Sequence, residues 1–118
     1  MSLLYIALGG GLGAILRFLL TEYVNNNISN LIPLGTLFVN VLGCFVIGCI
    51  AGFIASKSSP IYFFFVIGFL GSFTTMSAFS IQTFELLTTD TINGIIYVIL
   101  TFSFTILATY LGLMVFSK

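Results

Sequence analysis

The sequence has no histidine and no tryptophan, and its charged side chains are three basic and three acidic ones among 118 residues. Charged residues therefore make up 5% of the chain, whereas a soluble domain carries roughly 25%. So few charges do not cover a water-facing surface, which excludes a soluble globular domain. The lack of histidine, of paired carboxylates and of a nucleotide-binding loop argues against an enzyme. We also expect no nucleic-acid partner.

What the sequence has in abundance is apolar side chains, which form 59% of the chain and give a mean hydropathy of +1.26. A membrane helix needs about 20 mostly apolar residues. Stretches of this kind cover residues 2–24, 33–56, 61–88 and 92–117, approximately. Polar residues such as those at 25–30 separate them, and Pro33 and Pro60 stand where helices would begin. The sequence predicts an all-α, multi-pass protein of the cell membrane, with a single domain of four transmembrane helices.

The distribution of charge indicates only weakly how the four spans are oriented in the membrane. With four spans, both termini lie on one side of the membrane together with the loop near residue 57. That side carries Lys57 and Lys118, whereas Arg17 lies within the first span, nearer the other side. Two basic residues against one or none favour cytoplasmic termini only weakly. Such a small bias leaves room for insertion in both orientations.

The third apolar stretch is interrupted by small and polar residues near the expected centre of the bilayer. Gly68, Gly71, Ser72, Thr74 and Thr75 would allow the helix to unwind there. Unpaired backbone groups are costly in lipid, so irregular backbone is tolerated only where protein buries it or where it lines a cavity. A break between two half-helices presents carbonyls that can coordinate a cation and N–H groups that favour an anion. The alternative is a kink that only packs against another helix.

The second span has a face of small or polar residues. Residues four apart share a helix face, and this face consists of Thr36, Asn40, Cys44, Gly48, Gly52 and Ser56. Small residues allow helices to approach closely in lipid, which accounts for most of this face. Asn40 has two interpretations, because an intramembrane amide either joins helices by hydrogen bonds or lines an ion path.

The first span carries an arginine on the same face as two glycines. Gly9 and Gly13 indicate close packing against another helix, and Arg17 follows them at the same spacing. An intramembrane arginine costs at least ~2.5 kcal/mol on insertion scales unless it reaches the interface or meets water. Arg17 would therefore anchor the helix or attract anions into a water-filled vestibule.

The fourth span has a hydroxyl face formed by Thr101, Thr105 and Thr109. Threonine can satisfy its hydroxyl on the backbone one turn earlier, so such a face is weak evidence when taken alone. Together with Asn40 it suggests a polar track across the membrane.

Three motifs in this order resemble those of the Fluc (CrcB) fluoride channels. Residues 9–17 (GGGLGAILR) resemble the family's GGxxGAxxR, and residues 35–40 (GTLFVN) resemble its GTxxVN. Residues 68–80 (GFLGSFTTMSAFS) resemble its GxxGGxTTFSTFS. The three motifs, the chain length and the four expected spans extend the resemblance over the whole chain.

This resemblance implies a dimer of two oppositely oriented subunits, a second copy or a homologous chain, with fluoride pathways along their interface. It implies a structural sodium ion at that interface, held by backbone carbonyls that fall here on Gly71 and Thr74. The family's first-span arginine falls on Arg17. Its pathway residues fall on Asn40, Met76, Ser77, Phe79 and Ser80. The chain would then let fluoride leave the cell passively.

The sequence departs from the family pattern at Ser72, Ala78 and Gln82, where glycine, threonine and glutamate are usual, and at Met76. Met76 stands in place of the first of two pore phenylalanines. An aromatic ring has a positive edge that can face an anion, as Phe79 can, and methionine offers none. The chain is therefore alternatively a pore-impaired partner in a heterodimeric fluoride channel, or an assembly subunit without transport activity.

A small multidrug-resistance transporter is a rival of similar length and span number. That mechanism needs a membrane-embedded carboxylate in the first helix to exchange protons for a cationic drug. Here Glu22 lies near the end of the first span and Glu85 lies late in the third. The positions of both acids disfavour the transporter.

Overall fold

The computed structural model describes residues 1–28, 31–54 and 57–116, and these residues form helices and no strand. The elements are α1 (Ser2–Asn27), α2 (Leu34–Phe53), the π-helix η1 (Tyr62–Leu70), α3 (Gly71–Phe73), α4 (Met76–Thr89) and α5 (Thr91–Phe116). In the described part of the chain, four helical segments are long and apolar enough to cross a membrane. These are Ser2–Asn27, Leu34–Phe53, Tyr62–Thr89 and Thr91–Phe116. The prediction of an all-α protein with four membrane-capable helices is confirmed.

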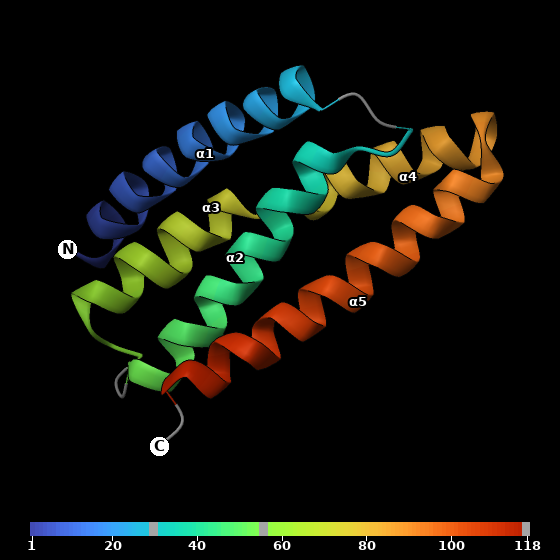
Figure 1. Cartoon of the computed structure of the whole chain (residues 1–118). Helices are drawn as coiled ribbons and strands as arrows, with labels where there is room; N and C mark the ends of the chain where they lie inside the picture. The colour runs from blue at the N-terminus through green and yellow to red at the C-terminus, as the bar shows by residue number, and fades with distance from the viewer. Residues whose placement is uncertain (29–30, 55–56, 117–118) are drawn as a thin grey trace.

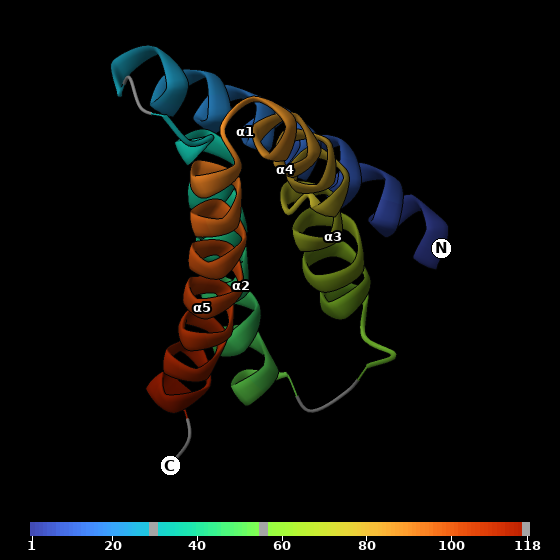
Figure 2. The same ribbon diagram turned by 90° about the vertical axis from the view of Figure 1, so that its right-hand side faces the viewer.

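The helices form two packed pairs joined through α4. Helix α2 lies alongside α5, and α1 lies alongside η1 and α3 (Figure 1). Helix α4 continues from the α3 side of the molecule and packs against the beginning of α5 (Figure 2). The N-terminus and the end of α5 lie toward the same side as the connection between α2 and η1. This arrangement places the junction of α3 and α4 next to α2.

Glycines set the close approach within each pair. A side chain at Gly13 of α1 would overlap the backbone of Phe69 in η1. A side chain at Gly48 of α2 would overlap the backbone of Thr109 in α5, close to Gly112. Because apolar burial gives little net attraction between helices in lipid, such backbone-to-backbone packing stabilises the bundle. The glycines of the first and second spans therefore act as packing residues, as their spacing indicates.

Helix α1 extends further than the sequence pattern predicts. The asparagines at 25–27 were expected to end the span at residue 24, but the helix continues through Asn27. Asn27 donates its side-chain Nδ2 to the carbonyl of Tyr23 at 2.8 Å, one turn back. Asn25 Oδ1 accepts from Gly35 N at 3.1 Å and so joins the end of α1 to the start of α2.

The other boundaries differ from the prediction by a few residues. Helix α2 begins directly after Pro33. The third and fourth helical segments are each shifted by about a residue from the expected bounds. The expected ends of the second span, at 55–56, and of the fourth span, at 117, lie outside the described residues, as does Lys118.

The third segment changes its backbone form three times. It begins as a π-helix, is α-helical over Gly71–Phe73, and then has two residues in extended conformation. Thr74 has φ −80° and ψ 156°, and Thr75 has φ −147° and ψ 110°, after which α4 begins at Met76. Extended backbone leaves part of the helical hydrogen-bond pattern unmade here, although Thr74 N still donates to Leu70 O at 3.1 Å. Partners from other helices replace some of the missing bonds and belong to the site described below.

Candidate functional site

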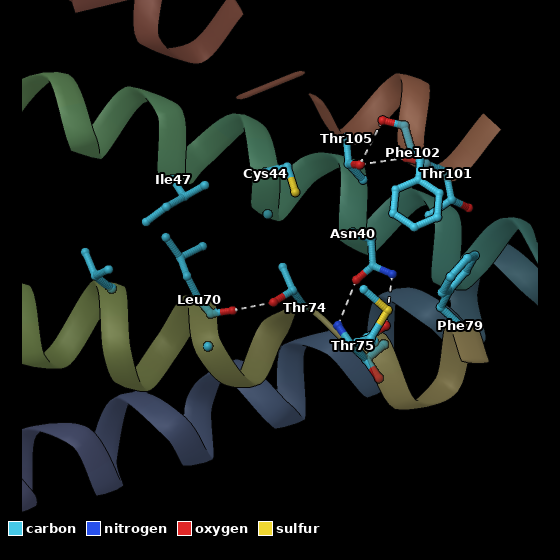
Figure 3. A pocket seen from close by; sticks show the side chains of 14 residues that line it. Asn40, Cys44, Ile47, Leu70, Thr74, Thr75, Phe79, Thr101, Phe102 and Thr105 are labelled. Carbon is cyan, nitrogen blue, oxygen red and sulfur yellow. Dashed lines mark hydrogen bonds between the residues drawn. The ribbon is translucent and has the colours of Figure 1, made fainter. Parts of the chain in front are cut away.

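A pocket of about 360 Å³ lies between α2, η1, α3, α4 and α5, beside the two extended residues (Figure 3). Its lining includes many of the residues predicted to form an ion site: Asn40, Gly71, Thr74, Met76, Phe79, Thr101 and Thr105. The remaining predicted residues, Arg17, Ser77, Ser80 and Thr109, do not line it. The fold therefore brings residues from the second, third and fourth spans together around one pocket.

Asn40 holds the extended segment from the side of α2. Its Oδ1 accepts a hydrogen bond from Thr75 N at 2.7 Å, and its Nδ2 donates to Thr75 O at 3.0 Å (Figure 3). The Asn40 side chain is only 7% exposed. Only one orientation of the amide satisfies both contacts, because nitrogen donates and oxygen accepts. The pair supplies hydrogen bonds that the interrupted helix does not, so Asn40 joins two helices and also lines the pocket.

The two threonine hydroxyls of the segment close the helix ends on either side. Thr74 Oγ1 donates to Leu70 O at 3.0 Å, one turn back. Thr75 Oγ1 accepts from Ala78 N at 3.2 Å and so caps the start of α4. Threonine is a favoured residue at this capping position. The adjacent threonines thus end one half-helix and begin the next.

The carbonyl oxygens near the end of α3 differ in their partners. Ser72 O accepts a hydrogen bond from Arg17 Nε at 3.0 Å. In the described part of the chain, no donor reaches the carbonyl oxygen of Gly71 or of Thr74. Carbonyls at the C-terminal end of a helix carry partial negative charge, and hard cations prefer oxygen ligands. The carbonyl oxygens of Gly71 and Thr74 therefore have the chemistry that a cation ligand needs.

Arg17 is half-buried on α1 and lies outside the pocket. Its bond to Ser72 O gives it a protein partner at the end of α3, a contact that spacing along the sequence did not indicate. An arginine beside the last carbonyls of a helix also interacts favourably with the helix dipole.

The aromatic residue Phe79 turns inward from α4, and its neighbour Met76 does not. Phe79 is 7% exposed, and Met76 is 67% exposed. The Phe79 ring meets Phe102 edge to face, with centroids 5.9 Å apart, and contacts Tyr97 at 5.3 Å. Ser77 and Ser80 are exposed on the surface of α4. The predicted pathway residues therefore point both into the bundle and away from it.

The hydroxyl face of α5 is not uniform. Thr105 Oγ1 donates to Thr101 O at 2.7 Å, and Thr109 Oγ1 donates to Thr105 O at 3.0 Å. Thr101 is 7% exposed, and its hydroxyl has no hydrogen-bond partner among the described residues. Thr101 therefore differs from the other two, whose hydroxyls bond to the backbone of α5.

Sequence reasoning did not identify Tyr97 as part of the site. Tyr97 is fully buried, packs on Phe79 and donates its hydroxyl to Gln82 Oε1 at 3.1 Å. The available signal was its position one turn before Thr101 on the same face of the fourth span. Gln82 is one of the positions that depart from the family pattern, and this bond gives it a structural partner.

Comparisons with known proteins agree over almost the whole chain. The family described as CrcB-like protein, Camphor Resistance (CrcB), matches residues 4–113. A relative from Campylobacter jejuni subsp. jejuni is 41% identical over 98% of this chain and 97% of its own. Relatives from Flavobacterium psychrophilum and Rhizobium meliloti are 36% and 38% identical, covering 97% and 94% of this chain and 95% and 92% of their own. Each of the three is named a fluoride-specific ion channel, FluC. The chain belongs to the CrcB family, a family of fluoride channels and not of enzymes.

Proposed function

We propose that this chain is a subunit of a fluoride-selective channel, which lets fluoride cross the cell membrane passively and leave a cell whose interior is negative. The observation that carries the proposal is the pairing of Asn40 with Thr75 beside the pocket. A broken helix in lipid is tolerated where protein buries the break or where it lines a cavity. Here the break has both features, and relatives of the chain are named fluoride channels.

The working unit in this proposal is a dimer of two chains in opposite orientations. Met76, Ser77 and Ser80 are exposed on α4, beside the end of the pocket to which Met76 contributes. A pathway along the interface of two copies would use these outward-facing groups together with inward-facing Phe79. The weak charge bias between the two sides of the membrane supports insertion in both orientations.

A sodium ion is proposed at the dimer interface, held by the carbonyl oxygens of Gly71 and Thr74. These oxygens fit the ion, because neither has a hydrogen-bond donor in the described part of the chain and both residues line the pocket. A second copy would supply a second pair of ligands. When bound, the cation would offset part of the large cost of moving fluoride out of water.

For the anion, the chain offers several weak interactions in series. The Thr101 hydroxyl is buried and unpaired among the described residues, and Asn40, whose Nδ2 has a second N–H besides the one bonded to Thr75 O, also lines the pocket. Tyr97 and Phe102 hold the ring of Phe79, which can present its positive edge to an anion. Serial sites of moderate strength allow an ion both to enter and to leave.

A second candidate function is that of a pore-impaired partner in a heterodimeric fluoride channel. Met76 favours it, because this residue is 67% exposed and stands where the family pattern has phenylalanine. A methionine at the subunit interface offers an anion no positive ring edge, so a pathway that depends on this position would lose one of its sites.

The test is fluoride release from liposomes. We expect the purified chain to release fluoride under an imposed potential, measured with a fluoride electrode, with little release of chloride. The Campylobacter jejuni relative serves as the positive control. If the chain releases no fluoride alone but does so when co-expressed with a homologous subunit, the heterodimer is the working form. If neither preparation releases fluoride while the relative does, the channel proposal is wrong.

A further inference from the structure

Arg17 and Asn40 hold the interrupted segment from opposite sides. From α1, Arg17 Nε donates to Ser72 O at 3.0 Å. From α2, Asn40 bonds to both backbone groups of Thr75. Thr74 lies between these two attachment points, and its carbonyl oxygen is without a donor in the described part of the chain.

We propose that Arg17 is a positioning residue for the cation site: its guanidinium fixes the end of α3, so that the carbonyl oxygens of Gly71 and Thr74 keep their places. Ser72 does not line the pocket, whereas Gly71 and Thr74 do. The bond therefore engages the carbonyl of a residue outside the pocket lining and leaves the carbonyl oxygens of Gly71 and Thr74 without a donor in the described part of the chain. This inference rests on the proposed function, because it concerns the sodium ion named there.

The physical need for such a residue follows from the end of the helix that η1 and α3 form together. The chain leaves the helical conformation after Phe73, so the last carbonyls of α3 have no partners further along the helix. Close packing of α1 brings Arg17 within reach: a side chain at Gly13 would overlap the Phe69 backbone, and one at Gly10 would come within 3.2 Å of Ser72 Oγ. Without the guanidinium, the end of α3 would have to be ordered at the moment the ion binds, which weakens binding.

This role differs from that of a charge attracting anions into a vestibule. A vestibule charge acts through its sign, and lysine would replace it. A positioning arginine acts through its Nε–H and planar shape, which lysine lacks. The positive charge itself, next to a cation site, opposes sodium. Arg17→Lys therefore retains the unfavourable charge and loses the favourable contact.

The experiment measures sodium-dependent thermal stabilisation of the purified full chain, without fluoride, against N-methylglucamine chloride at equal ionic strength. We expect Arg17→Lys to raise the sodium concentration for half-maximal stabilisation at least about tenfold, the scale of a lost hydrogen bond to a charged group. Arg17→Gln should raise this sodium concentration no more than Arg17→Lys does, because glutamine also removes the repulsion between the positive charge and sodium. Lys57→Gln, which removes a charge from the exposed loop, is the matched control and should stay within about twofold of wild type.

If a variant aggregates without sodium, the sodium concentration that restores a single size-exclusion peak provides the same comparison. A half-maximal concentration for Arg17→Lys within about twofold of wild type, with Arg17→Gln impaired, would show that charge alone matters and would overturn the proposal. A wild-type chain with no sodium-specific stabilisation would overturn the cation site and this inference together. Fluoride release from the same preparation would then show whether the channel proposal still stands.

Discussion

The hydrogen bonds between Asn40 and Thr75 provide the sharpest test of how the third segment is held. Asn40→Ala leaves both backbone groups of Thr75 without their partner in a buried setting. Each unpaired buried group costs about 1–3 kcal/mol, which sets a range of about 2–6 kcal/mol. Water in the adjoining pocket of about 360 Å³ can satisfy part of the loss. We therefore expect a cost of about 2–4 kcal/mol in the free energy of unfolding.

Cys44→Ala is the matched control, because Cys44 lies one turn further along α2 and lines the same pocket. It should cost no more than about 1 kcal/mol, since it removes one small, half-buried group. The assay is reversible unfolding in mixed micelles, followed by circular dichroism, with fluoride release measured in parallel. We expect Asn40→Ala to lose at least about tenfold in fluoride release. If its unfolding free energy lies within about 0.5 kcal/mol of the Cys44→Ala value, the amide does not hold the segment and the reasoning is refuted.

Three further predictions concern single residues. Met76→Phe should raise fluoride release or leave it unchanged in the liposome assay, and a fall would contradict our account of that position. Thr74→Ala removes the bond from Oγ1 to Leu70 O and should cost about 0.5–1.5 kcal/mol in thermal or chemical unfolding. Its sodium dependence should not change, because the backbone carbonyl remains; loss of the sodium effect would mean that the hydroxyl is the ligand. Gly48→Ala should destabilise the bundle by about 1–3 kcal/mol through overlap with the Thr109 backbone. Gly11→Ala, which meets nothing within 4 Å, should be neutral or stabilising in the same unfolding assay, and equal effects of the two would refute the packing argument.

Much of the fold could be predicted because composition and length leave few solutions in lipid. Backbone groups in a bilayer need internal partners, so long apolar stretches become helices. Regularly spaced glycines mark where helices meet, as Gly13 and Gly48 do. The end of α1 was misjudged because asparagine is a common turn residue, and in this chain Asn27 bonds instead to its own helix.

The candidate site could be predicted in its residues but not in its contacts. The sequence pattern allowed two roles for Asn40, because an amide side chain has donors and an acceptor but the sequence does not show which groups it bonds to. The structure pairs it with Thr75, a residue 35 positions away. The partner of Arg17 could not be predicted either. Every residue has a backbone carbonyl, and the sequence does not show that the one of Ser72 accepts this bond. Tyr97 was overlooked because a tyrosine among apolar residues carries no signal of its buried hydroxyl contact.

The central claim is that this chain forms a channel selective for fluoride, and electrical recording in planar bilayers tests it most directly. The account predicts steady fluoride current at symmetrical concentrations, a reversal potential that follows the fluoride gradient, and little current when chloride replaces fluoride. The Campylobacter jejuni relative, reconstituted in the same lipid, provides the reference current. Chloride current equal to fluoride current would contradict the account. The account would also be contradicted if this chain gave no fluoride current, either alone or with a homologous subunit, while the relative conducts.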